Sequence, residues 1–180
     1  MKVTPTRLPR VLLIEPTVHG DERGFFLETF QAERYLAKAG IASSFVQDNQ
    51  SRSRRGVLRG LHLQTVRPQG KLVRVARGEV FDVAVDVDPK SATFGRWVGS
   101  VLSDANHHQL WIPPGYAHGY LVLSDVADFE YKCTDYYDPK SETGVLWNDP
   151  ELGIDWPIAE PTLSPKDRGL PTLAELARRR

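Results

Sequence analysis

The sequence predicts an all-β fold, a sandwich or jelly roll with few helices. Glycine and proline together contribute 27 of the 180 residues (14 Gly and 13 Pro), and they are spread along the whole chain. Between them lie short runs of alternating apolar and polar residues, the pattern of many strands joined by turns. Because there is no repeat, low-complexity tract or linker, we expect one domain over residues 1–180.

Eleven segments alternate in this way and are predicted to be strands. Side chains at successive positions of a strand point to opposite faces, so each run can bury one face and expose the other. Arg77 and Gly78 separate two such runs and predict a hairpin turn. In chain order the predicted strands are Val11–Ile14, Gly24–Phe30, Ser44–Gln47, Val57–Gln64, Lys71–Arg77, Glu79–Val87, Arg96–Leu102, Gln109–Ile112, His118–Leu123, Asp128–Asp135 and Val145–Trp147.

Only two segments have helical character. Gln31–Ala39 ends at Gly40, a residue type that commonly stops a helix. Thr172–Arg178 follows Pro171, which is well placed at a helix start. Many strands and two short helices in one domain favour two packed sheets, and the mouth of such a barrel is a common ligand site.

Charge and composition exclude several classes of protein. Basic and acidic residues are equal at 23 each, so nothing predicts a global nucleic-acid or membrane surface, and an anionic ligand needs a local basic cluster. The single cysteine, Cys133, excludes an internal disulfide framework and is expected to be a packing residue in a reducing compartment. Met1–Pro5 lacks the apolar core of a signal peptide, and no apolar run reaches 18 residues, so we expect a cytoplasmic protein.

The segment from Arg59 to Lys71 suggests chemistry at a carbonyl group. Alternation places His62 on one face of its strand with Gly60 and Gln64, and Arg59 on the other face. Lys71 begins the next predicted strand and can return to the cavity that His62 faces. A neutral base beside a fixed cation suits enolate chemistry, since one group removes a proton and the other stabilises the oxyanion. The alternative is a half-buried strand with ordinary surface charges.

A second histidine tests whether the site could hold a metal ion. The turn at Pro113–Gly119 leads into His118 and resembles the second metal-ligand motif of cupins. The first cupin motif would supply two histidines and a glutamate, but Gln64 replaces the second histidine and Lys71 lies near the position of the acid. Because an ammonium group repels a divalent cation, we predict no metal.

Three further clusters are weaker candidates. Gln47 and Asn49 are two residues apart, so both amides can face one cavity and orient hydroxyl or phosphate oxygens. Arg23 and Glu28 lie near the ends of a predicted strand, where alternation separates them unless a bulge intervenes. Tyr131 lies in an alternating run and acts as an acid only if its hydroxyl faces the cavity of His62; otherwise it is a packing residue.

Taken together, these segments resemble the dTDP-4-dehydrorhamnose 3,5-epimerase family over nearly the full length of the chain. Any one of them is weak evidence, but eight in the order of the family are specific. The matching stretches are Gly20–Phe26, Phe45–Asn49, Gly56–His62, Gln69–Arg74, Gly78–Val83, Trp111–Gly119, Trp147–Pro150 and Leu163–Arg168.

The resemblance implies a metal-free cupin jelly roll (a double-stranded β-barrel) that acts on a dTDP-4-keto-6-deoxy sugar without a cofactor. It implies that His62 is the general base, oriented by Asp167, that Tyr131 returns a proton from the opposite face, and that Lys71 lies near the C4 oxygen. It also implies a homodimer in which the segment from Arg23 to Glu28 reaches the neighbouring subunit. The remaining implied substrate contacts are Arg23 and Arg59 at the diphosphate, Phe26 and Tyr137 as stacking candidates that can equally be core or rim aromatics, and Glu28, Gln47, Asn49, His118, Glu142 and Lys166.

Three other functions remain open at this stage. A mono-epimerase on the same scaffold differs only in how the sugar ring is held after the first inversion. A non-catalytic cupin that binds sugar nucleotides would lack the pair of His62 and Tyr131, which this chain has. A metalloenzyme is the third alternative.

Overall fold

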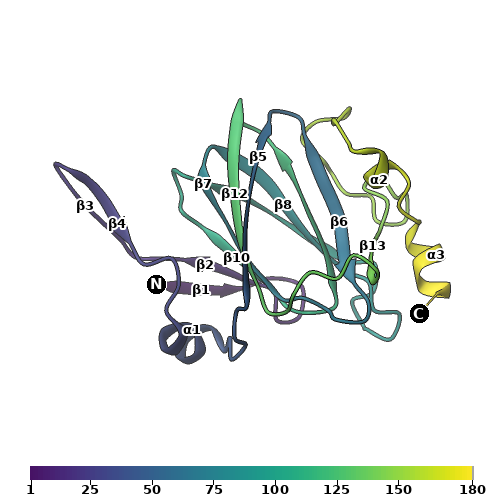
Figure 1. The fold of residues 1–180 in the computed structure, drawn as a ribbon, viewed down its shortest axis with the longest axis horizontal. Helices are drawn as coiled ribbons and strands as arrows, with labels where there is room; N and C mark the ends of the chain where they lie inside the picture. The colour runs from purple at the N-terminus through teal and green to yellow at the C-terminus, as the bar shows by residue number, and fades with distance from the viewer. Residues whose placement is uncertain (180) are drawn as a thin grey trace.

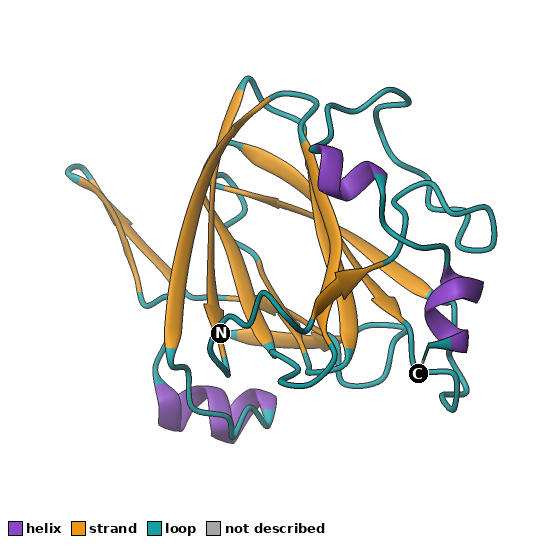
Figure 2. Cartoon of the chain, turned by 45° about the vertical axis from the view of Figure 1, so that its right-hand side comes forward, coloured by secondary structure: helices purple, strands orange, loops and turns teal. Residues whose placement is uncertain are grey.

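The computed structural model describes residues 1–179 and has two antiparallel sheets that face each other, with a two-stranded arm projecting from one side (Figures 1 and 2). The predicted all-β jelly roll with a few short helices is confirmed. No helix within residues 1–179 combines the length and the apolar character needed to cross a membrane.

One sheet has six strands and the other has five. The order in the six-stranded sheet is β1 (Lys2–Pro5), β2 (Leu12–Glu15), β10 (Gln109–Ile112), β7 (Lys71–Arg77), β12 (Val126–Cys133) and β5 (Gln47–Arg54). The order in the five-stranded sheet is β13 (Glu142–Gly144), β6 (Leu58–Gln64), β11 (Tyr116–Val122), β8 (Glu79–Asp86) and β9 (Trp97–Ser103). The arm is the hairpin of β3 (Val18–Asp21) and β4 (Gly24–Leu27).

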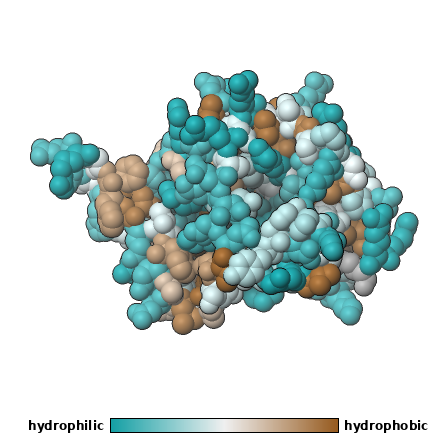
Figure 3. Space-filling view, viewed as in Figure 1, coloured by the Kyte–Doolittle hydropathy of each residue, from teal (hydrophilic) through white to brown (hydrophobic). Residues whose placement is uncertain are grey.

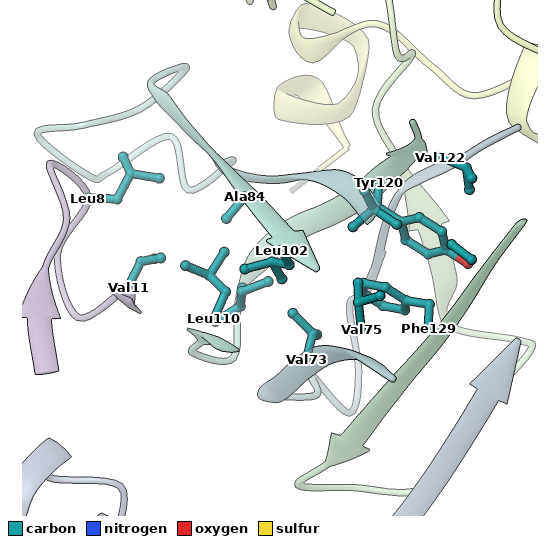
Figure 4. Packing of buried hydrophobic residues seen from close by; sticks show 13 residues of the cluster. Leu8, Val11, Val73, Val75, Ala84, Leu102, Leu110, Tyr120, Val122 and Phe129 are labelled. Atoms are coloured by element: carbon teal, nitrogen blue, oxygen red, sulfur yellow. The ribbon is translucent and has the colours of Figure 1, made fainter. Parts of the chain in front are cut away.

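Apolar side chains from the inner faces of both sheets form the core between them. Val73 and Val75 of β7 and Phe129 of β12 meet Tyr120 and Val122 of β11 across the barrel, all at most 4% exposed (Figure 4). Burying apolar side chains on both inner faces is the main favourable contribution to packing two sheets together.

Three helices lie outside the sheets. α1 (Ala32–Ala39) begins at Gln31, whose side chain accepts from the Arg34 amide, and ends at Gly40 in the left-handed conformation, as predicted. α3 (Leu173–Arg178) begins with a capping box between Thr172 and Glu175 and covers the outer face of the five-stranded sheet. α2 (Pro165–Arg168) is a single turn that alternation and length could not predict.

Most predicted strands are correct to within one or two residues, but three of them are wrong and two strands were missed. The strand predicted at Ser44–Gln47 begins only at Gln47, because Phe45 instead packs edge-on against Trp111 in an aromatic cluster. The strand predicted at Gly24–Phe30 ends at Leu27, before the chain turns into α1. The strand predicted at Val145–Trp147 lies earlier, at Glu142–Gly144. The short strands β1 and β3 were not predicted.

The predicted hairpin at Arg77 and Gly78 is also wrong. β7 pairs with β10 and β12 in the six-stranded sheet, whereas β8 pairs with β11 and β9 in the five-stranded sheet. Gly78 is therefore the point where the chain crosses from one sheet to the other. Its φ of 81° and the carbonyl oxygen of Val126, 2.2 Å from where a Cβ would lie, both require glycine.

Candidate active site

A cavity of about 620 Å³ lies between the two sheets, and the core residues Tyr120 and Phe129 form part of its lining. Its walls come from both sheets, and the segment around α2 closes one side. It brings together eleven of the fourteen residues that the sequence suggested: Gln47, Asn49, Arg59, His62, Lys71, His118, Tyr131, Tyr137, Glu142, Lys166 and Asp167.

His62 and Asp167 form a hydrogen-bonded pair although 105 residues separate them. The His62 Nε2 atom lies 2.5 Å from Asp167 Oδ1. Ser164 begins α2, accepting from the Asp167 amide at 3.1 Å, and this turn directs the carboxylate at the imidazole. A carboxylate oxygen accepts, so the ring proton lies on Nε2 and Nδ1 is left as the basic atom.

Asp167 is ionised near neutral pH. Burial alone would raise the pKa of this carboxyl, but the hydrogen bond and charge of His62, the Ser164 hydroxyl and the charge of Lys166 outweigh it, and the pKa lies below its usual 3.8. An ionised partner fixes the tautomer of the imidazole and stabilises the imidazolium that forms when the ring takes a proton.

Arg59 faces the same cavity as His62, contrary to the alternation prediction. Directly paired residues share a face, and β6 pairs His62 with His118 of β11 but Arg59 with Tyr120. Three steps along β6 therefore match two steps along β11, so β6 carries one extra residue at Gly60. The extra residue reverses the alternation and turns Arg59 inward, where its Nε donates to Ser53 Oγ at 3.0 Å.

Lys71 lies on the opposite wall, at the start of β7. It pairs with Cys133 of β12, and no carboxylate of residues 1–179 lies within ion-pair distance of its ammonium group. Burial lowers the pKa of Lys71 below 10.5, more than the nearby Cys133, Glu142 and Asp82 raise it. An ammonium without a carboxylate partner is available to an oxyanion in the cavity.

Tyr131, Asn49 and Gln47 line the same wall as Lys71. Tyr131 pairs with Asn49 and Cys133 pairs with Gln47, so all of these side chains share the inner face of the six-stranded sheet, as the spacing of the two amides predicted. The Gln47 amide donates to Asn49 Oδ1 at 3.0 Å. Burial raises the pKa of Tyr131 to about 12, so its phenol stays protonated.

His118 forms a second pair with a buried aspartate, Asp82, that sequence analysis did not select. His118 Nε2 donates to Asp82 Oδ2 at 2.9 Å, and the Asp82 side chain is 0% exposed. Burial lowers the pKa of His118 by more than Asp82 raises it. The signal for Asp82 was present, because it is a lone charged residue inside the apolar run from Val80 to Val85.

At the rim, Tyr137 and Lys166 both donate to Glu142 Oε2 of β13. Burial would raise the pKa of Glu142, but these two bonds lower it below 4.5. The three residues therefore join β13, the segment after β12 and α2 into one polar rim beside Asp167.

The remaining three predicted residues, Arg23, Phe26 and Glu28, lie on or beside the arm and outside the cavity. Arg23 pairs with Asp21 of the same hairpin at 2.5 Å, and Glu28 pairs with Arg34 of α1 at 2.5 Å. Figure 3 shows a hydrophilic tip with a hydrophobic patch behind it on the arm, where Phe25, Phe26 and Val18 are 61%, 70% and 40% exposed.

The donors that face the cavity do not fit a divalent metal ion. Gln64, at the position of a cupin histidine ligand, uses its amide to bind the backbone of Arg67, Tyr136 and Asp138. Lys71 adds a positive charge, and both histidines already hold an aspartate. Among residues 1–179 no three His, Cys, Asp or Glu side chains are grouped to hold a metal ion.

The arrangement suits proton transfer next to a carbonyl group. The imidazole of His62 is on the five-stranded sheet, whereas the phenol of Tyr131 and the ammonium of Lys71 are on the facing six-stranded sheet. A sugar ring bound between the walls would meet a proton acceptor on one face and a proton donor on the other.

Comparison with known proteins agrees with this geometry. The family model described as dTDP-4-dehydrorhamnose 3,5-epimerase matches residues 5–175. The enzyme of that name from Pseudomonas aeruginosa is 56% identical over 169 residues, covering 93% of each chain. A dTDP-6-deoxy-D-glucose-3,5-epimerase from Legionella pneumophila, solved with dTDP-4-keto-L-rhamnose, superimposes with a TM-score of 0.94 at 56% identity, covering 97% of this chain and 96% of that one.

A more distant relative has a narrower name. The dTDP-4-dehydrorhamnose 3-epimerase of Streptomyces niveus is 40% identical over 176 residues, covering 97% of this chain and 85% of its own. The matches extend over almost the whole chain, and this chain therefore belongs to the dTDP-4-dehydrorhamnose 3,5-epimerase family.

Proposed function

We propose that this protein is an isomerase that inverts C3 and C5 of dTDP-4-dehydro-6-deoxy-D-glucose, giving dTDP-4-dehydro-L-rhamnose for the rhamnose of cell-surface polysaccharides. The observation that carries the proposal is the pair of His62 and Asp167 at 2.5 Å, facing Tyr131 and Lys71 across one cavity. We take residues 1–180 as a single catalytic domain, acting in the cytoplasm, where its buried thiol Cys133 stays reduced.

In the first inversion, Nδ1 of His62 takes the proton from C5. The electron pair of the broken C–H bond forms the C4–C5 double bond of an enolate, and the C4 oxygen gains the negative charge beside the Lys71 ammonium. The Tyr131 hydroxyl then gives a proton to C5 from the opposite face, and solvent restores both side chains.

The second inversion at C3 repeats these steps on the other side of the same ketone after the ring turns in the site. One set of groups is sufficient because both carbons are adjacent to C4. No electrons leave the substrate, so the reaction requires no redox cofactor.

Binding groups surround these residues. Arg59 suits the diphosphate, since a guanidinium group can bind two phosphate oxygens at once. Gln47, Asn49 and His118 line the cavity, and Tyr137, Glu142 and Lys166 form its rim. Polar groups of this kind can orient the sugar and the nucleotide.

We also propose that the protein is a homodimer in which the arm completes the site of the partner. Three observations support this proposal: the arm projects from the barrel, it exposes two phenylalanine rings, and it carries the family's contacts Arg23, Phe26 and Glu28 outside its own cavity (Figure 1). Exposed aromatic side chains beside a charged group are typical of a protein interface.

A proton NMR time course with the dTDP-ketosugar in D₂O tests the function. The expected result is deuterium at both C5 and C3, with the L-configured product, and loss of both in His62→Ala. Deuterium at a single carbon would instead assign the narrower activity by which the Streptomyces niveus relative is named. Full activity of His62→Ala would overturn the proposal altogether.

A further inference from the structure

The arm is anchored where its second strand rejoins the barrel, at the carbonyl of Thr29. Gln109 of β10 donates its side-chain amide to this oxygen at 2.8 Å, and the hydroxyl of Tyr35 in α1 lies 3.0 Å from the same oxygen. The Tyr35 hydroxyl also donates to Gln109 Oε1 at 2.7 Å. We propose that Gln109 is a positioning residue for the active site of the partner subunit, because it fixes the root of the arm; this inference rests on the proposed arm exchange.

The burial of these groups supports the role. Gln109 and Tyr35 are each 1% exposed, and both are among the largest fully buried side chains. A buried amide is costly unless both its ends are bonded. Here the oxygen accepts from Tyr35 and the amide nitrogen donates to Thr29, so the amide has one satisfied orientation and Thr29 has one fixed position.

The position of Gln109 in the sheet links it to both strands of the arm. Gln109 pairs directly with Ile14 of β2, the strand that leads into β3. Its side chain meanwhile binds Thr29, just beyond the end of β4. On the β3 side, the N-terminal amine of Met1 donates to the Thr17 hydroxyl at 2.6 Å.

At the root, Glu28 also pairs with Arg34 of α1 at 2.5 Å, but the arm has little support along its length. β3 and β4 form ladder pairs only with each other among residues 1–179, and the side chain of Phe25 contacts the ring of His107 at 4.6 Å between centroids. The turn between β3 and β4 lies about five residues from Thr29, or about 17 Å at the rise of a strand. A tilt of about 10° at the root would move the tip by about 3 Å, enough to displace a diphosphate contact.

Hybrid dimers test this inference, because they separate the subunit that donates the arm from the subunit that holds the active site. Two differently tagged chains are co-expressed and the mixed dimer is isolated. In the first hybrid, one subunit carries His62→Ala and Gln109→Met and its partner is wild type. In the second, one subunit carries His62→Ala and its partner carries Gln109→Met. Because His62→Ala inactivates one site, each hybrid keeps one active site. In the first hybrid this site receives its arm from the subunit with Gln109→Met, and in the second it receives an arm with the normal Gln109.

The expected result is that KM rises at least about tenfold in the first hybrid and stays at the wild-type value in the second, while kcat changes less than KM. Leu110→Val, on the same strand and 0% exposed, is the matched control, since it destabilises the core without touching Thr29. It should lower the melting temperature and leave KM unchanged in both hybrids.

Arg23→Ala in place of Gln109→Met separates failure of the inference from failure of the arm exchange. If Arg23→Ala raises KM only when it is on the arm donor but Gln109→Met does not, Gln109 has no positioning role and the inference is overturned. The inference is also overturned if Gln109→Met raises KM in the second hybrid, or if Leu110→Val raises KM as much as Gln109→Met does. If Arg23→Ala acts on its own subunit or has no effect, the proposed arm exchange is wrong.

Discussion

His62 on β6 and His118 on β11 are directly paired across the five-stranded sheet, and each donates a ring hydrogen to its own buried aspartate. Their exposure differs, since the His62 side chain is 25% exposed and that of His118 is 7% exposed. Burial lowers the pKa of His118, and the charges of Lys71 and His62 lower it further. His118 is thus an uncharged side chain that lines the cavity, and the more exposed His62 is placed to accept a proton.

The first prediction concerns the partner of His62. Asp167→Asn replaces an ionised acceptor by an amide that can also donate, so the imidazole loses its fixed tautomer and the stabilisation of its charged form. We expect kcat to fall by about 10²- to 10⁴-fold with a small change in KM. Steady-state kinetics and the rate of deuterium uptake at C5 measure this effect.

Asp48→Asn is the control for this variant. Asp48, on β5, is likewise a carboxylate in an ion pair, with Lys132 at 2.8 Å, but it lies outside the cavity. Its removal should leave kcat within about twofold, since exposed ion pairs contribute little. Equal losses of activity in both variants would mean that the aspartate of the pair has no special role.

The second prediction separates the acid from the base. The pKa of Tyr131 is raised to about 12 by burial, so its hydroxyl is a proton donor at neutral pH. In Tyr131→Phe, His62 still removes the proton and can return it only from its own side. We therefore expect inversion to fall by about 10²- to 10⁴-fold while deuterium exchange with retained configuration continues.

Tyr116→Phe is the matched control, because this hydroxyl donates to the Pro9 carbonyl at 2.8 Å, away from the cavity. It should invert the substrate at the normal rate. If Tyr131→Phe loses exchange and inversion together, the hydroxyl acts before or during proton removal, and the assignment as the returning acid is wrong.

Sequence reasoning predicted the strands whose alternation reports burial and failed where other constraints dominate. β7 and β10 begin and end at the predicted residues, because apolar side chains alternate along β7 and both strands lie inside the sheet. β5 was misplaced because its inner face lines a polar cavity, so Gln47, Asn49 and Ser51 replace the apolar residues that mark a strand. A strand that forms part of a ligand site loses the pattern by which strands are recognised.

The sequence and the family resemblance together selected eleven residues that line the cavity, but they missed Asp82 and did not predict the geometry. Alternation placed Lys71 correctly in the cavity of His62, yet it placed Arg59 on the wrong face, because the extra residue at Gly60 is visible only in the pairing with β11. The pairing of Asp167 with His62 depends on how a distant turn packs, which no local pattern reports. The resemblance to a family supplied that pairing, and the structure supplied its geometry.

The third prediction is the alkaline limit of the reaction. Burial lowers the pKa of Lys71 below 10.5, whereas that of Tyr131 is raised to about 12. Lys71 is charged below its pKa, so kcat should fall as the pH rises through a value below 10.5, before the phenol ionises. A kcat profile between about pH 7 and 11 measures this limb.

Asp82→Asn checks the assignment of the alkaline limb to Lys71, because the direction in which the limb should move is fixed. The negative charge of Asp82 raises the pKa of Lys71, so its removal should move the alkaline limb to lower pH. Asp48→Asn should leave the limb in place, because Asp48 does not line the cavity. A limb that stays fixed in Asp82→Asn, or that moves to higher pH, would contradict the assignment to Lys71.

The last prediction is a pH-dependent loss of stability from His118. Burial lowers the pKa of His118 below its usual 6.5, so the unfolded chain binds this proton more readily than the folded one. The resulting stability is fully present above pH 6.5 and is lost as the pH falls through the folded-state pKa, at no more than about 1.4 kcal/mol per pH unit. The pKa values of the Asp167 and Glu142 carboxyl groups lie below their usual 3.8 and 4.5, so these groups change the stability only in more acidic solution.

Denaturant unfolding at pH 7.5, 6.5 and 5.5, chosen about one pH unit apart, should therefore show a decline in the free energy of unfolding, and His118→Gln should flatten that decline. His19→Gln, on the exposed arm, should leave that decline unchanged; a decline of equal slope in His118→Gln would exclude His118 as its source.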